Sequence, residues 1–204
     1  MNALLAASLC FGSAACNAPK KETDSAEVAE EQNEQKMVTD DAEDDAEFMV
    51  KAASGGMLEV QLGQMAQEKA SSQLVKDFGK QMVTDHTKAN EELKALAAKK
   101  NITLPTTVSN DHQKHIDELA KLSGTEFDEE YMQLMTKDHH EDVELFEEAA
   151  KEAEDPEIKA FANKTLPTLQ HHLQMAEQKK DMAEDRDKNG TDKNQASTDS
   201  HTKE

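Results

Sequence analysis

The sequence predicts an all-α fold, and three observations support this prediction. The chain of 204 residues contains only 7 Gly and 4 Pro, and aromatic residues make up 3% of it. A β-sandwich or barrel needs more turns and more strand-favouring residues than this composition supplies. Four long segments repeat apolar residues at steps of three and four, which is the period of one helix face.

The charge of the chain argues against nucleic acid as a partner. Asp and Glu number 43 and Lys and Arg number 23, so the formal net charge is −20. Phosphate binding needs a basic surface, and the sequence contains no Gly-rich phosphate-binding loop. The composition therefore indicates an acidic helical protein and identifies no reaction.

The first residues indicate an export signal. Residues 3–15 are apolar or small; they are too few to span a bilayer, which takes about 20 residues, but they suit a signal peptide over 1–15. Cys16 directly follows Ser13-Ala14-Ala15, which looks like a bacterial lipobox whose Cys is acylated. We therefore expect a periplasmic cell-envelope protein anchored to the outer membrane by Cys16, with a plain secretory signal and a cytosolic tail as alternatives.

The folded part is expected to lie between two polar segments. Residues 17–47 contain twelve acidic residues and three lysines and almost no large apolar side chain, so 16–47 is predicted to be a disordered acidic tether. Residues 184–204 are rich in Asp, Lys, Asn, Ser and Thr and are predicted to be a disordered polar tail. The folded domain is therefore predicted over 48–183.

The first helical hairpin is predicted over about 45–68 and about 72–100, where apolar residues recur at helical steps. Asn101 and Pro105 end the second of these helices. The loop between the two segments is short, and a short loop makes consecutive helices antiparallel neighbours.

The second hairpin is predicted over about 126–153 and about 156–183. Thr125 caps the first of these helices, and Asp155-Pro156 places a cap and a proline at the start of the second. The loop between them is also short, so these two helices are expected to be antiparallel as well.

A shorter helix, predicted over about 109–122 and ended by Gly124, lies between the two hairpins. The connecting stretch 101–124 is long enough to carry the chain back along the bundle. The expected architecture is therefore a ferritin-like four-helix bundle, in which two antiparallel helical hairpins are joined by a crossover containing a short fifth helix.

Each long helix carries one ionisable residue in its apolar stripe. At 1.5 Å per residue, the distances from the hairpin turns place the two members of each hairpin within a few Å in height. These four residues could therefore meet near the middle of the bundle. They are Glu59, His86, His139 and His172. Asp85 and Asp138 directly precede two of the histidines and could be ligands or accept hydrogen bonds from them.

Buried polar groups without partners cost several kcal/mol, so these four residues must satisfy one another, bind a metal or face a wet groove. The di-iron centre of ferritin-like bundles needs two Glu-x-x-His motifs. Val83 and Thr136 stand three residues before His86 and His139, so a di-iron oxidase or ferroxidase centre is not expected. A structural polar network is the favoured interpretation. A single transition-metal ion, zinc or iron, held by the four residues is the alternative.

Four sequence blocks, taken in order, resemble the bacterial domain of unknown function 4142 family. The blocks are FMVKAASGGMLEVQLG over 48–63, MVTDH over 82–86, FDEEYM over 127–132 leading to Asp138-His139, and LPTLQHH over 166–172. The resemblance covers about 48–178. It implies a ferritin-like bundle and an envelope location, since members are often labelled outer membrane proteins, and it implies no established activity. The four clustered residues match the family's motif residues.

Two functions are therefore kept open. The first is a non-enzymatic, lipid-anchored envelope bundle of unknown specific role, for which a stress-related role is one candidate. The second is a metal-binding or metal-dependent protein that uses the His/Glu cluster. No catalytic residue and no protein partner is assigned, and the only partner expected is the membrane that holds Cys16.

Overall fold

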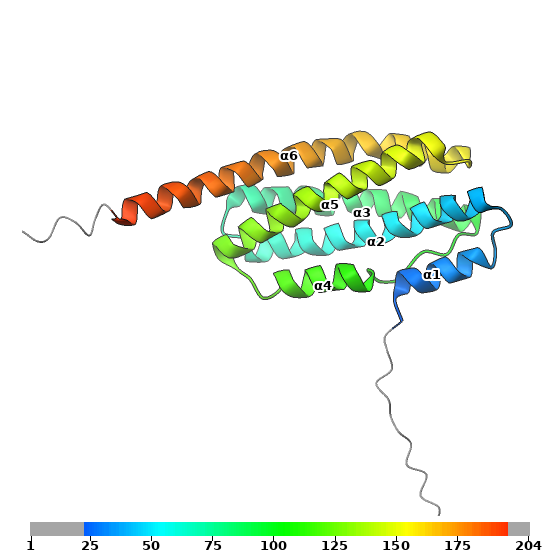
Figure 1. Cartoon of the computed structure of the whole chain (residues 1–204), viewed down its shortest axis with the longest axis horizontal. Coiled ribbons are helices and arrows are strands. Elements are labelled where there is room, and N and C mark those ends of the chain that lie inside the picture. Colours follow the sequence, from blue (N-terminus) through cyan, green and yellow to red (C-terminus); the bar gives the residue numbers. More distant parts are fainter. Residues whose placement is uncertain (1–22, 196–204) are drawn as a thin grey trace, which may run out of the picture.

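The structure is a computed structural model that describes residues 23–195 (Figure 1). The expected signal peptide over 1–15 and the expected lipid anchor at Cys16 lie outside the described residues. Within them the fold is all-α, as the sequence predicts, with six helices and no strand. The helices are α1 (Ser25–Glu34), α2 (Asp40–Lys69), α3 (Gln73–Lys100), α4 (Asn110–Leu119), α5 (Gly124–Glu152) and α6 (Pro156–Gln195). None of these helices has the length and apolar character needed to cross a bilayer.

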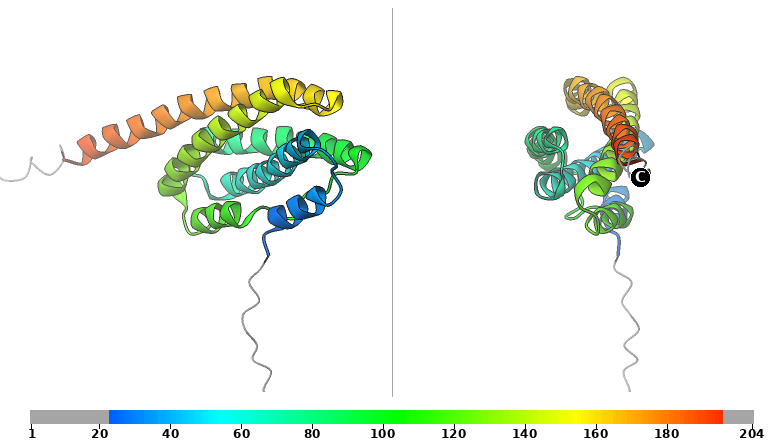
Figure 2. Two further views of the ribbon diagram at one scale, coloured as in Figure 1. Left: turned by 45° about the vertical axis from the view of Figure 1, so that its right-hand side comes forward. Right: turned by 90° about the vertical axis from the view of Figure 1, so that its left-hand side faces the viewer.

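The four long helices form two antiparallel hairpins, α2 with α3 and α5 with α6, that pack on each other (Figures 1 and 2). Helix α2 contacts α5, and α3 contacts α6. The short helix α4 lies in the connection from α3 to α5 and contacts α2 and α5. The predicted arrangement of two hairpins joined by a crossover with a short helix is confirmed.

Each hairpin turn is closed by a buried aspartate from the other hairpin. Asp128 of α5 accepts hydrogen bonds from the backbone N–H groups of 71–72 at 3.0 and 2.8 Å. Asp45 of α2 accepts hydrogen bonds from the backbone N–H groups of 154–155 at 3.2 and 2.8 Å. These amides precede or begin a helix and have no partner within it. The two aspartates therefore fix the relative height of the hairpins.

The prediction of a disordered tether over 16–47 is wrong for α1 and for the first turns of α2, which are helical. Ala29 of α1 is buried, and Asn33 makes two hydrogen bonds with the crossover. Its Nδ2 donates to the Thr103 carbonyl at 2.9 Å, and its Oδ1 accepts from the Thr103 N–H at 2.7 Å. A buried alanine and several side-chain hydrogen bonds to the crossover, those of Asn33 among them, thus hold a segment whose composition alone indicates disorder.

The C-terminal end also differs from the prediction, because α6 continues beyond 183 to Gln195. The polar composition of 184–204 predicts a disordered tail there. A helix that is already formed extends at little cost, since each added residue contributes one backbone hydrogen bond. No proline follows Pro167 within α6 to stop this extension.

The apolar core consists of two separate clusters, one toward each end of the bundle. Near the α5–α6 turn, the rings of Phe48 and Phe146 meet edge to face at 5.0 Å between centroids. Near the α2–α3 turn, the rings of Phe78 and Tyr131 meet similarly at 6.1 Å. The helices place buried polar side chains between the two clusters, and this band is called the polar layer below.

The helices α2 and α3 approach each other closely beside the polar layer. A Cβ added to Gly63 would lie 2.6 Å from the carbonyl oxygen of Gly79, and one added to Gly79 would lie 2.8 Å from that of Gly63. Both distances are shorter than side chains tolerate, and backbone atoms cannot rotate away. The two glycines therefore set the spacing at which side chains of α2 and α3 meet.

Candidate metal centre

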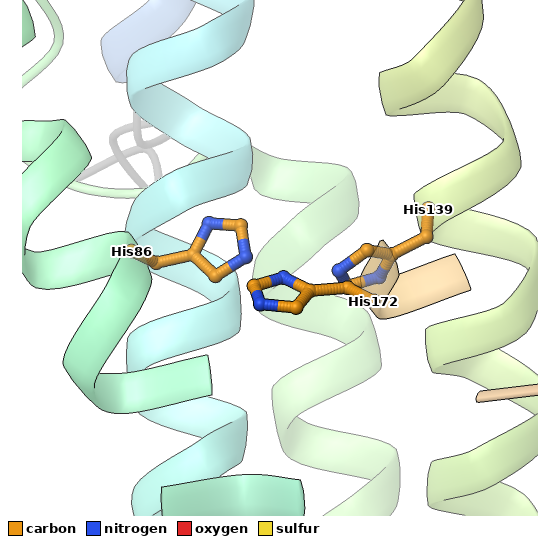
Figure 3. Close-up of side chains that lie close together, drawn as sticks. All are labelled: His86, His139 and His172. Atoms are coloured by element: carbon orange, nitrogen blue, oxygen red, sulfur yellow. The ribbon is translucent and has the colours of Figure 1, made fainter. Parts of the chain in front are cut away.

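Four side chains converge in the polar layer, one from each long helix. Glu59 comes from α2, His86 from α3, His139 from α5 and His172 from α6. The three imidazole rings point toward one another, with centroids 5.3 to 5.6 Å apart (Figure 3). Glu59, His139 and His172 are 0% exposed, and His86 is 5% exposed. The structure thus brings together the four residues selected by counting along the sequence.

Local geometry determines which nitrogen of His139 is available. Its Nδ1 lies 3.0 Å from the Met135 carbonyl oxygen one helical turn earlier. A carbonyl only accepts, so Nδ1 carries the proton and, in the neutral ring, Nε2 keeps its lone pair. That Nε2 lies 3.2 Å from Oε1 of Glu59. The lone pair of His139 Nε2 therefore faces an oxygen of the Glu59 carboxyl group, and no hydrogen bond joins the two atoms.

Asp85 orients His172 in the corresponding way. Nε2 of His172 donates to Oδ2 of Asp85 at 2.9 Å, which leaves Nδ1 of the neutral ring with its lone pair. This Nδ1 is buried and has no hydrogen-bond partner. A carboxylate that holds the far N–H of an imidazole is the usual support of a metal-binding histidine.

Glu59 and His86 form the shortest contact in the polar layer. Oε2 of Glu59 lies 2.5 Å from Nδ1 of His86, yet neither oxygen of Glu59 has a partner in hydrogen-bond geometry. Nε2 of His86 and Nε2 of His139 are also buried without one. Each unsatisfied buried polar group costs about 1–3 kcal/mol. A single bound group that contacts all of these atoms would therefore stabilise the polar layer.

Burial sets the protonation of these groups. It lowers the pKa of His86 and of His172 to about 4, although Asp138 and Asp85 oppose this shift for His86. Burial, together with His86 and His172, holds the pKa of His139 well below its usual value. The imidazoles are therefore neutral at pH 7, which is the form that binds metal. Burial also raises the pKa of the Glu59 carboxyl, and a cation bound beside it would oppose that shift.

Asp138 and Asp142 of α5 form a second set of acidic groups beside Glu59. Asp138 is 8% exposed, and its Oδ2 is buried without a hydrogen-bond partner. Burial raises the pKa of Asp138 and of Asp142, and the charge of Glu59 adds to this for both. The sequence predicts a role for Asp138 but not for Asp142, which lies one helical turn later on the same face. The signal for Asp142 in the sequence is that it stands four residues after Asp138, close to His139 of α5.

Two groups of these residues have ligand atoms close enough to hold one ion. One nitrogen from each of His86, His139 and His172 lies within 4.8 Å of the others. The same separation holds for one ligand atom from each of Glu59, Asp138 and His139. All members of both groups are buried, and the two groups share His139.

The fold and the polar layer define an all-α bundle with a buried centre of imidazoles and carboxyl groups. The chain belongs to the family described as domain of unknown function (DUF4142), whose family model matches residues 18–178. This confirms the resemblance drawn from the sequence blocks.

A solved structure shares the fold. The crystal structure of a DUF305 fragment from Deinococcus radiodurans is similar with a TM-score of 0.58 and 13% identity. The similarity covers 66% of this chain and 93% of that chain. No curated protein matches the sequence. The comparisons thus establish the family and the fold, and the function is inferred from the residues of the centre.

Proposed function

We propose that this protein binds one transition-metal ion, zinc or iron, through Glu59, His86, His139 and His172. The observation that carries the proposal is the convergence of three buried imidazole nitrogens within 4.8 Å. Two of these rings are turned by a second hydrogen bond, to Met135 and to Asp85, so that a lone pair is left free. Neutral imidazole is the commonest protein ligand of zinc and also suits iron.

The ligand set fits a single ion better than a pair. A zinc–nitrogen bond is about 2.0–2.1 Å, so tetrahedral ligands lie about 3.3 Å apart. Three rings whose nitrogens lie within 4.8 Å of one another reach that spacing by small side-chain movements. Glu59 supplies a carboxylate as the fourth ligand. The Glu-x-x-His motifs of di-iron bundles remain absent from the sequence.

A metal-free polar network is the second candidate. Glu59 Oε2 and His86 Nδ1 lie 2.5 Å apart, so a small rotation of either side chain would let the two groups share a proton. In that case the polar layer would only stabilise the fold and fix the relative height of the two hairpins. The two candidates differ in whether the folded protein takes up metal.

Elemental analysis after equilibrium dialysis against zinc, and separately against iron(II), tests the proposal. We expect the parent protein to retain one ion per chain, because the centre offers one set of convergent ligands. His172→Ala and His139→Ala should lose the ion. His171→Ala is the matched control, because His171 is exposed and neighbours His172; it should retain the ion. A parent without metal, or ligand variants that still retain it, would establish the polar network instead.

We also propose that this metal-binding bundle is attached to the cell envelope through acylated Cys16, on the periplasmic side of the outer membrane. The support is the short apolar segment that ends in Ser13-Ala14-Ala15 before Cys16. Two acyl signals on one residue suffice for stable anchoring.

Cell fractionation tests the anchor. Cys16→Ser should move the mature protein from the membrane fraction to the soluble fraction, because it removes the acylated thiol. Cys10→Ser, which changes the only other cysteine, should leave the protein with the membranes. A Cys16→Ser protein that stays in the membrane fraction after a salt wash would refute the anchor.

A further inference from the structure

An acidic groove leads from the surface toward the polar layer. It has a volume of about 730 Å³ and lies among α1, α2, α4 and α5. Its acidic lining residues are Glu30, Asp111, Glu118, Asp138, Glu141 and Asp142. The three lysines that also line it are paired with carboxylates at Glu47, Asp111 and Glu141. The groove therefore offers an excess of negative charge to a cation in solution.

Asp138 belongs both to the groove and to the polar layer. It lines the groove, yet only 8% of the residue is exposed. Its Oδ2 is buried and has no hydrogen-bond partner. Its ligand atom also lies within 4.8 Å of those of Glu59 and His139. A buried, unpartnered carboxyl oxygen thus stands where the groove reaches the buried ligands.

Asp142 is a second acidic residue of the groove, and it lies next to Gly55 of α2. Gly55 lines the groove, and a Cβ at this position would lie 3.4 Å from Oδ1 of Asp142. Asp142 also lines a small cavity of about 20 Å³ beside Glu59 and His86. Carboxyl groups therefore continue from the groove to the side of the polar layer where His86 lies.

The two groups of potential ligands cannot each hold an ion at the same time. His139 belongs to both, and its Nδ1 is occupied by the Met135 carbonyl. Only Nε2 remains, and one lone pair binds one ion. The two groups are therefore alternative positions for a single ion.

We propose that Asp138 is the first buried ligand for an incoming divalent cation, which Asp138, Glu59 and His139 hold before it passes to His86 and His172. His139 stays bound throughout, so the ion moves between the two positions without returning to water. This inference rests on the proposed metal-binding function. Carboxylate oxygens suit the first position because a hard, hydrated cation prefers oxygen ligands.

Stopped-flow absorption with cobalt(II) as the probe tests this route, since its visible bands report the ligands around it. Asp138→Asn should slow association about tenfold, because it removes the carboxylate that first takes the cation from the groove. Dissociation should slow by a similar factor, because the ion leaves by the same route, so the equilibrium affinity should change little. Glu141→Gln is the matched control: it removes one charge from the same helix and groove at an exposed position, and should slow association by about twofold at most.

A second variant separates the route from damage to the fold. Asp138→Glu keeps a carboxylate and should recover part of the lost rate, while far-UV circular dichroism shows all three variants to be as helical as the parent. Equal rates in Asp138→Asn and the parent would overturn the route and leave the metal centre standing. Weaker equilibrium binding with an unchanged association rate would make Asp138 a permanent ligand and also overturn it. A parent that binds no cobalt would instead refute the proposed function itself.

Discussion

Saturating zinc should raise the midpoint of thermal unfolding of this protein by about 8–16 °C. A ligand that binds only the folded state at about 1,000 times its dissociation constant adds about 4 kcal/mol of stability. For a chain of this size, each kcal/mol shifts the midpoint by about 2–4 °C. Glu59, His86, His139 and His172 come from four different helices, so the complete ligand set exists only in the folded state. Differential scanning calorimetry with zinc and with excess chelator measures the shift.

Variants show whether the shift comes from the polar layer. His139→Ala should lower stability by about 1–3 kcal/mol even in chelator, because it leaves buried Glu59 with one neighbour fewer. Zinc should then no longer raise its midpoint. His171→Ala, at an exposed position next to His172, should show the full rise of the parent. A zinc-dependent rise that survives in His139→Ala would place the ion elsewhere.

Acidification from pH 7 to pH 5 should lower the free energy of unfolding of the metal-free parent by about 2 kcal/mol more than that of His172→Gln. Burial lowers the pKa of His172 from 6.5 to about 4. Between these values the unfolded chain binds more protons than the folded protein. The stability contributed by neutral His172 is therefore present above pH 6.5 and is lost as pH falls toward 4. Urea unfolding at both pH values, in chelator, measures the difference.

The comparison with a variant is needed because other groups of the layer act in the opposite direction. Burial raises the pKa of Glu59 and of Asp138, so their contribution to stability is lost as pH rises rather than as it falls. The sum of these effects in the parent can be small. His171→Gln should follow the parent, since His171 is exposed. If His172→Gln loses as much stability as the parent, His172 is not held neutral by burial.

The positions of the main helices and of the centre follow from periodicity. The apolar residues of the long helices recur at helical steps, and counting from the turns places Glu59 and the histidines at one height. The polar layer also explains why this count works. Sliding one hairpin by a helical turn would place His86 or His139 among the side chains of an apolar cluster, where it would have no polar neighbour.

Other features could not be predicted, because they depend on contacts between residues far apart in the chain. Helix α1 is held by hydrogen bonds between Asn33 and Thr103 and between Asp24 and the N–H of Asn110, across 70 and 86 residues. Nothing in the acidic sequence of 17–47 signals these partners. The free nitrogen of His139 likewise depends on which acceptor its other nitrogen finds, and the sequence does not specify that.

Asp45 and Asp128, which bind the turn amides, are made at different times relative to those amides during synthesis. Ser71 is made 57 residues before Asp128, the side chain that binds its amide. At about 5–20 residues per second, the ribosome takes about 3–11 s to cover that distance. Asp45, in contrast, already exists 109 residues before the amide of Glu154 that it binds. The turn amides of the first hairpin therefore have no aspartate partner until Asp128 is made. The turn amides of the second hairpin can bind Asp45 as soon as they are made.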